Sequence, residues 1–233
     1  MDSPSHETAD ASRLRPDGGT DVSQPSLSPA DIAENTAHFE TLVQLLTNPA
    51  LARVYVYICY WGPVSPPEIM DALDLSKATT YNYIDTVVER NLVNRDDSNR
   101  PQQLTASPVA IVDPEHAVYI TPTVLHAIAL QEINDDVSYF VGRYGIGTLV
   151  AALRGTGLHF AGKATQRMVA NDIDVHHHEG MMIVHALVPA LAMGQQHDPY
   201  FDRLFPDIHE EIELPVDINE MAIVPEQQVG DSE

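Results

Sequence analysis

The stretch PPEIMDALDLSKATTYNYIDTVVERN at residues 66–91 constrains the fold more than any other part of the chain. Apolar residues recur at helical spacing before and after Asp74, with only a short gap between the two runs. Ser76 is a suitable N-cap, so the second helix is expected to begin sharply after a tight turn. Two short helices joined in this way must cross and bury a shared set of apolar residues, which are Ile69, Leu73, Leu75, Ile84 and Val87.

The flanking segments extend this pattern in both directions. A helix is expected at 50–61, where Gly62-Pro63 closes it, and β-rich runs follow at 108–113 and 116–121. Pro114 and Glu115 connect these two runs, which predicts a β-hairpin. The order of helix, helix, turn, helix and hairpin over 50–121 is typical of a winged helix-turn-helix. The predicted fold class is therefore mainly α with a small β-hairpin wing.

The segment IMDALDLSKATTYNYIDTVVERNLVNR resembles the TrmB, MarR and ArsR group of winged-helix transcription regulators of archaea and bacteria. In that pattern a T-x-Y-type helix is followed by a Leu-Val strand, and the resemblance extends over roughly 50–121. It implies a DNA-binding domain whose second helix enters the major groove.

The charge of the chain resembles that of proteins from the salt-loaded cytoplasm of halophilic archaea. The formal net charge is −22, and Lys77 and Lys163 are the only lysines. At molar salt the Debye length falls to about 3 Å, so dense negative charge is tolerable there. The acidic composition therefore does not argue against nucleic acid as a partner in such a cytoplasm.

Targeting and redox features favour a cytoplasmic location. The N-terminal residues MDSPSHETAD lack the basic and apolar regions of a signal peptide, and no apolar run reaches the length of a membrane helix. Cys59 is the only cysteine, which excludes an internal disulfide framework. We expect no contact with a membrane.

The second helix carries side chains suited to reading DNA. A helical wheel anchored on buried Ile84 turns Thr80 and Val88 inward and places Tyr81 at the edge. Asn side chains can pair with adenine and Thr methyl groups with thymine, while a helix start suits a phosphate. Arginines beyond the helix are expected to contact the DNA backbone or minor groove, although Asp96-Asp97 weakens this expectation. The candidate DNA-binding residues are Ser76, Lys77, Thr79, Tyr81, Asn82, Tyr83, Thr86, Arg90, Arg95 and Arg100.

The whole chain is expected to divide into four parts. Residues 1–27 are expected to form a disordered acidic tail and 214–233 a second acidic tail. Residues 28–122 would hold the first helix and the DNA-binding domain, and 123–213 a helical domain for packing or dimerisation. The first helix, capped by Ser28, carries a stripe that suits either a core face or a short dimer seam, formed by Ile32, Thr36, Phe39, Val43 and Leu46.

Residues 169–188 repeat the pattern of residues 69–88 at an offset of 100. Val169, Asp174 and Val184 take the places of Ile69, Asp74 and Ile84. The segment is therefore interpreted as a second, degenerate helix-turn-helix without a following hairpin. The residues from Glu179 to Gly194 include no Lys or Arg, so its second helix suits a protein neighbour rather than DNA.

The run of three histidines at 176–178 is a weak candidate for a metal site. Consecutive helical residues point about 100° apart, so the three side chains do not converge. The low-probability candidates for ligands are His176, His178 and Glu179, and the favoured interpretation is an exposed helix start. His126 and His185 are interpreted as hydrogen-bonded packing residues rather than ligands.

The sequence as a whole predicts a sequence-specific DNA-binding transcription regulator that reads the major groove with helix 76–90 and forms a homodimer. No nucleotide loop, glycine fingerprint or catalytic carboxylate pair is present, so we expect neither an enzyme nor a cofactor. Two alternatives remain: an interaction or assembly module that does not bind DNA, and a metal-sensing repressor that uses the histidine run.

Overall fold

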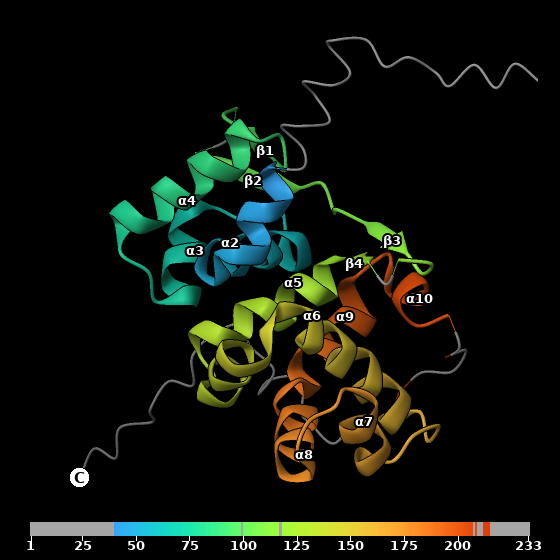
Figure 1. Ribbon diagram of the computed structural model, residues 1–233. Coiled ribbons are helices and arrows are strands. Elements are labelled where there is room, and N and C mark those ends of the chain that lie inside the picture. Colours follow the sequence, from blue (N-terminus) through green and yellow to red (C-terminus); the bar gives the residue numbers. More distant parts are fainter. Residues whose placement is uncertain (1–39, 99, 117, 207, 209–211, 215–233) are drawn as a thin grey trace, which may run out of the picture.

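The computed structural model describes residues 40–98, 100–116, 118–206, 208 and 212–214. Figure 1 shows a mainly helical protein with two small antiparallel strand pairs, in agreement with the expected fold class at this level. The expected tail at 1–27, nearly all of the tail at 214–233 and the expected cap Ser28 lie outside the described residues.

The helices and strands follow the chain in a simple order. They are a helix at Glu40–Thr47, α2 (Pro49–Trp61), α3 (Pro66–Leu73), α4 (Lys77–Glu89), β1 (Val93–Asp96), β2 (Gln103–Ala106), β3 (Ile111–Asp113), β4 (Val118–Ile120), α5 (Pro122–Ala129), the 3₁₀ helix η1 (Leu130–Glu132), α6 (Asp135–Phe160), α7 (Gln166–Asp172), α8 (His177–Ala186), α9 (Val188–His197) and α10 (Phe201–Leu204).

The helix Glu40–Thr47 ends where the Asn48-Pro49 pair predicts, but its buried face differs from the predicted one. Leu42 and Leu45 are buried, whereas Val43 of the predicted stripe is 39 % exposed. A shift of one residue turns a helix by about 100°, so an error of this size moves the stripe off the core. The prediction of a core face is therefore wrong at Val43, whereas Leu46 of the same stripe packs against the core. Ile32, Thr36 and Phe39 lie outside the described residues.

The helices Glu40–Thr47 and Pro49–Trp61 meet at a bend of 105°. Asn48 occupies this bend, where its Oδ1 accepts a hydrogen bond from the N–H of Leu51 at 3.0 Å and so begins α2. No single helix in the described residues is long and apolar enough to cross a membrane, although this bent pair passes together on length and composition.

The part of the chain that the structure describes forms two hairpins, of which the sequence predicted the second. Strands β3 and β4 pair as expected, with Pro114 and Glu115 between them. The unpredicted hairpin, β1–β2, follows α4 directly and includes Arg95, which was expected in a loop before the hairpin. Buried Val93 and Leu104 fix its inner face. Leu104 also forms an antiparallel bridge with Val64, which lies two residues before α3.

Helix α2 lies at the centre of the packing. It contacts α3, α4 and β2 on one side and α5, η1 and α9 on the other, as Figure 1 lets the reader follow. Tyr55 on α2 is fully buried, and its hydroxyl donates to the Ser107 carbonyl and accepts the Val109 N–H. These two bonds fix the chain after β2. The buried apolar residues around α2 belong to one hydrophobic core, which extends from Leu42 to Ile212.

A buried carboxylate ties the C-terminal helices to α5. Asp198, which follows α9, is 6 % exposed and accepts hydrogen bonds from both the N–H and the Oγ1 of Thr123. Thr123 lies in the first turn of α5, where backbone N–H groups lack helical partners. Asp198 therefore satisfies the start of α5 from a distant part of the chain.

Helix α6 is kinked at Gly145, whose backbone (φ 82°, ψ 169°) is not helical. A φ in this region favours glycine over residues with a side chain. No kink is predicted at this position from the sequence. The segment before Gly145 carries Tyr139, Arg143 and Tyr144, which the kink sets at an angle to the rest of α6.

The turns before α4 and α8 share the same backbone geometry. Asp74 and Asp174 both adopt the left-handed conformation, with φ of 51° and 53°. The N–H of Leu75 bonds to the Met70 carbonyl, and the N–H of Val175 bonds to the Ala170 carbonyl, at 3.1 and 3.0 Å. The repeat at an offset of 100 therefore extends from the apolar spacing to the turn itself.

Gly180 allows α7 and α8 to approach closely, and its replacement should be costly. A Cβ at position 180 would lie 2.4 Å from the Cβ of Ala170 and 3.0 Å from its Cα. These atoms cannot rotate away, so Gly180→Ala should destabilise the protein by about 1–3 kcal/mol. The matched control is Gly142→Ala in α6, where the Cβ meets no atom within 4 Å. This control should instead raise the stability by about 0.5–1 kcal/mol. Denaturant unfolding of both variants, in high salt, checks the expectation, and equal effects would contradict it.

His126 and His185 differ from each other and from the expectation. His126 on α5 is fully buried with Tyr60 against its ring, but neither ring nitrogen has a hydrogen-bond partner among the described residues. Burial lowers the pKa of His126 to about 3, so the ring is neutral. His185 is exposed and contacts Gln166 at 3.2 Å. The packing role is confirmed for His126 alone, whereas among the described residues the expected hydrogen bond is found for His185 alone.

The buried ring of His126 should make the protein sensitive to acid. In the unfolded chain this imidazole binds a proton near pH 6.5, whereas the folded pKa is about 3. Its stabilising contribution is therefore complete above pH 6.5 and is lost as the pH falls towards 3, by about 1.4 kcal/mol per unit. The measurement is the free energy of unfolding across this pH range. In His126→Phe this part of the slope should disappear, while a slope equal to that of the parent protein would contradict the assignment.

Candidate nucleic-acid interface

Helix α4 begins at a hydrogen-bonded cap that uses the side chain of Ser76. Ser76 has extended backbone, and its Oγ accepts the N–H of Thr79 at 3.2 Å and lies 2.8 Å from the Thr79 Oγ1. Thr80 is fully buried and donates from its Oγ1 to the Ser76 carbonyl. Ser76 and Thr79, both candidates for DNA contact, are therefore engaged with each other at the start of the helix.

The outward side of α4 presents polar side chains, as the helical wheel predicts. Lys77 and Asn82 are exposed, and Thr79, Tyr81, Tyr83 and Thr86 are half-buried. The same side also exposes two acidic residues, Asp85 and Glu89, which are not among the candidate DNA-binding residues. The helical wheel places both carboxylates beside Asn82, so their outward position could be predicted from the sequence. The face is therefore mixed in charge rather than made only of neutral hydrogen-bonding groups.

The three candidate arginines occupy different environments. Arg90, after α4, lies 3.7 Å from the Glu40 carboxylate. Arg95, on β1, donates from its Nη2 to the Asp85 carboxylate at 2.5 Å. Arg100 is exposed in the connection between β1 and β2, and no ion pair to a described residue is found for it. The structure places Arg90 at the C-terminal end of α4 and Arg95 beside Asp85 of α4, each paired with a carboxylate.

A hollow of about 410 Å³ lies against one edge of α4. Asn82, Tyr83 and Thr86 form its α4 wall, and the helix Glu40–Thr47 and the start of α2 form the other. The residues on that second wall, none of them a candidate from the sequence, are Gln44, Thr47, Asn48 and Leu51. The approach of residues from different helices around one hollow is a tertiary effect, which the periodicity within a single helix does not predict.

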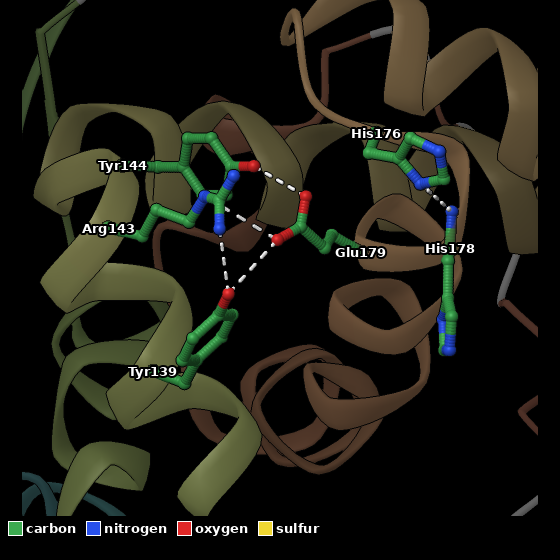
Figure 2. Close-up of polar contacts among 6 residues, drawn as sticks. All are labelled: Tyr139, Arg143, Tyr144, His176, His178 and Glu179. Atoms are coloured by element: carbon green, nitrogen blue, oxygen red, sulfur yellow. Dashed lines mark hydrogen bonds and ion pairs between the residues drawn. The ribbon is translucent and has the colours of Figure 1, made fainter.

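The second helix with the same turn, α8, presents a different chemistry. His176 caps it by accepting the N–H of His178 at its Nδ1, at 3.3 Å. Glu179 stands where Thr79 stands in the first unit, and Figure 2 shows that it points towards α6. His177, His178, Met181 and His185 are exposed on the opposite side of the helix.

Glu179 is held by a polar cluster on the first segment of α6 (Figure 2). Its Oε2 accepts the Tyr144 hydroxyl at 2.5 Å, and its Oε1 accepts the Tyr139 hydroxyl at 3.3 Å. Arg143 lies 3.5 Å from the same Oε1 and donates to the Tyr139 hydroxyl at 2.9 Å. The hydrogen bond from Tyr144 is the main reason that the pKa of Glu179 lies below its usual value. This cluster joins α8 to the kinked start of α6.

The three low-probability metal ligands do not converge. Figure 2 shows His176 and His178 turned away from the Glu179 carboxylate, which is occupied by Tyr139, Arg143 and Tyr144. Within the described residues, no group of three or more His, Cys, Asp or Glu side chains is arranged to hold a metal ion. The histidine run in this geometry serves to start α8.

Comparison with known protein families matches one segment of the chain. Residues 131–196 match a family of unknown function, DUF7437, which spans the segment from η1 to α9. No curated protein and no solved structure matches the chain. The matched segment contains the second turn and the Glu179 cluster but leaves out α2–α4 and both hairpins.

The Glu179 cluster can be tested through the titration of its carboxylate. Tyr144→Phe removes the hydrogen bond that contributes most to the low pKa of Glu179, so this pKa should rise towards its ordinary value. The matched control Tyr139→Phe removes a longer bond and should raise the pKa less. Carbon-13 NMR of the Glu179 carboxyl group during an acid titration measures both shifts. A larger shift in Tyr139→Phe would contradict the arrangement in Figure 2.

Proposed function

We propose that the protein is a sequence-specific DNA-binding transcription regulator in which α4 enters the major groove. The observation that carries the proposal is the sharp turn at Asp74 between α3 and α4, together with the β1–β2 hairpin that follows α4 directly. Val64 pairs with Leu104 on β2, so a third short extended segment lies beside the hairpin. This order and pairing support a winged helix-turn-helix with β1–β2 as its wing, in place of the hairpin at 108–121 that the sequence predicts as the wing.

The chemistry of α4 supports readout of bases. Asn82 is exposed near the middle of the outward side, and Thr86 lies one turn further along it. An Asn amide can form paired hydrogen bonds with adenine, and a Thr methyl can contact the thymine methyl. Lys77 in the first turn and Arg100 on the wing would then contact phosphates on either side of the groove.

A homodimer would suit this interface and the acidic chain. Each copy would supply one α4, and two half-sites bound together give the avidity that weak phosphate contacts lack at high salt. The exposed side of α8 favours contact between copies, because His178, Met181 and His185 carry no fixed negative charge. This assigns the second unit, interpreted as a degenerate helix-turn-helix, to assembly rather than to DNA.

A second candidate function is an interaction module that does not bind DNA. The observation in its favour is the acidic pair Asp85 and Glu89 on the side of α4 that would face phosphates. Selection from a pool of random-sequence DNA duplexes at high KCl separates the two. Enrichment of a common sequence supports the regulator, whereas its absence, together with unchanged transcript profiles in a deletion strain, favours the interaction module.

Asn82→Ala should weaken binding to the selected duplex by roughly 1–3 kcal/mol and relax the base preference at one position, because it removes a base contact. The matched control is Asn171→Ala, which truncates an exposed asparagine on α7, away from α4, and should leave the affinity unchanged. Fluorescence anisotropy with the selected duplex and single-base variants measures both effects. Equal affinities of Asn82→Ala and the parent protein would contradict the role of α4.

A further inference from the structure

Asp85 and Arg95 form an ion pair across the candidate interface. Asp85 lies on the outward side of α4, and Arg95 lies on β1, the first strand of the hairpin. The Arg95 Nη2 is 2.5 Å from the Asp85 Oδ1. The pair therefore joins the two elements that would approach DNA together. It also engages Arg95, a cation that is expected to contact phosphate.

The pair has the properties of a contact that a competing anion can replace. Its side chains are 25 % exposed for Arg95 and 53 % for Asp85, so solvent and ligands reach the carboxylate. It rests on a single contact through Nη2 rather than on the two-bond fork that an arginine and a carboxylate can form. An exposed pair of this kind contributes only about 0.2–1 kcal/mol, so a phosphate oxygen can compete with it.

We propose that Asp85 acts as an internal substitute for DNA phosphate, which Arg95 leaves when DNA binds. This inference rests on the proposed function. Asp85 would hold the guanidinium in place on the free protein and would become an unpaired carboxylate in the complex. Exchange of one anionic partner for another weakens the binding and reduces its dependence on salt.

The effect on salt dependence follows from ion counting. A free arginine that binds phosphate releases condensed cations from DNA, and the slope of log K against log salt is about −0.9 per phosphate neutralised. When Arg95 leaves Asp85, the exposed carboxylate attracts cations and offsets part of that release. The affinity of the parent protein should therefore fall less steeply with salt than its number of phosphate contacts implies.

The neighbouring residue Glu89 provides a matched control. It lies one turn after Asp85 on the same exposed side of α4, and no ion pair with a described residue is found for it. Glu89→Gln removes the same charge from the same face without releasing an arginine. It therefore measures the general repulsion between acidic side chains and DNA.

The experiment measures binding of the duplex recovered by selection, by fluorescence anisotropy, over a series of KCl concentrations. Asp85→Asn should bind about two- to fivefold tighter than Glu89→Gln at the lowest salt concentration, because no pair has to be broken. Its slope of log K against log salt should be steeper than that of the parent protein by up to about 0.9. In an Arg95→Gln background, Asp85→Asn should give no more than the effect of Glu89→Gln.

Three results are distinguishable from this outcome. If the parent protein binds no duplex, the proposed function fails and this inference fails with it. If the parent protein binds but Asp85→Asn matches Glu89→Gln in affinity and slope, only the exchange is overturned. If Asp85→Asn binds more weakly than the parent protein, Asp85 positions Arg95 for DNA, and the exchange is likewise overturned.

Discussion

The burial of α2 is the constraint on which the rest of the structure depends. Its buried residues lie on several sides of the helix, so neighbours must cover it from more than one direction. The cover comes from α3, α4 and β2 on one side and from α5 and η1 on the other. Tyr55 and Asp198 add hydrogen bonds between distant segments. The position of α4 relative to the C-terminal helices therefore follows from how α2 is packed.

The candidate interface combines ordinary geometry with an unusual balance of charge. A strongly acidic protein that binds DNA must keep its cations on one face and limit repulsion there. Here Arg90 and Arg95 are present beside α4, but each has a carboxylate partner, Glu40 and Asp85. The face is thus close to neutral within a chain of net charge −22. Under the proposed function, base contacts would contribute more to the affinity than they do in a basic DNA-binding domain at low salt.

The two helix pairs with the same turn show how one backbone geometry serves different chemistry. Both turns need a left-handed residue, and both use an aspartate, Asp74 and Asp174, which tolerate that conformation better than most residues. At the corresponding positions of the second helices, Thr79 faces outward near the cap and Glu179 bonds to α6. The match to a family of unknown function covers the second pair together with α6 and most of α9, and it leaves out the first pair. Attachment to α6, and not loss of the turn, separates the second unit from the first.

The sequence by itself determined the local elements. Helical spacing, the Ser76 cap and the Asn48-Pro49 and Gly62-Pro63 boundaries are short-range signals, and the helices that they predict are present. The same holds for the β3–β4 hairpin and for the turn repeated at an offset of 100. Only the tertiary structure decided which residues meet across elements. Leu104 of the β1–β2 hairpin pairs with Val64, and the partners of Arg95 and Glu179 come from other elements. Such contacts join residues that are distant along the chain or lie on separate elements, and the periodicity within one element does not encode them.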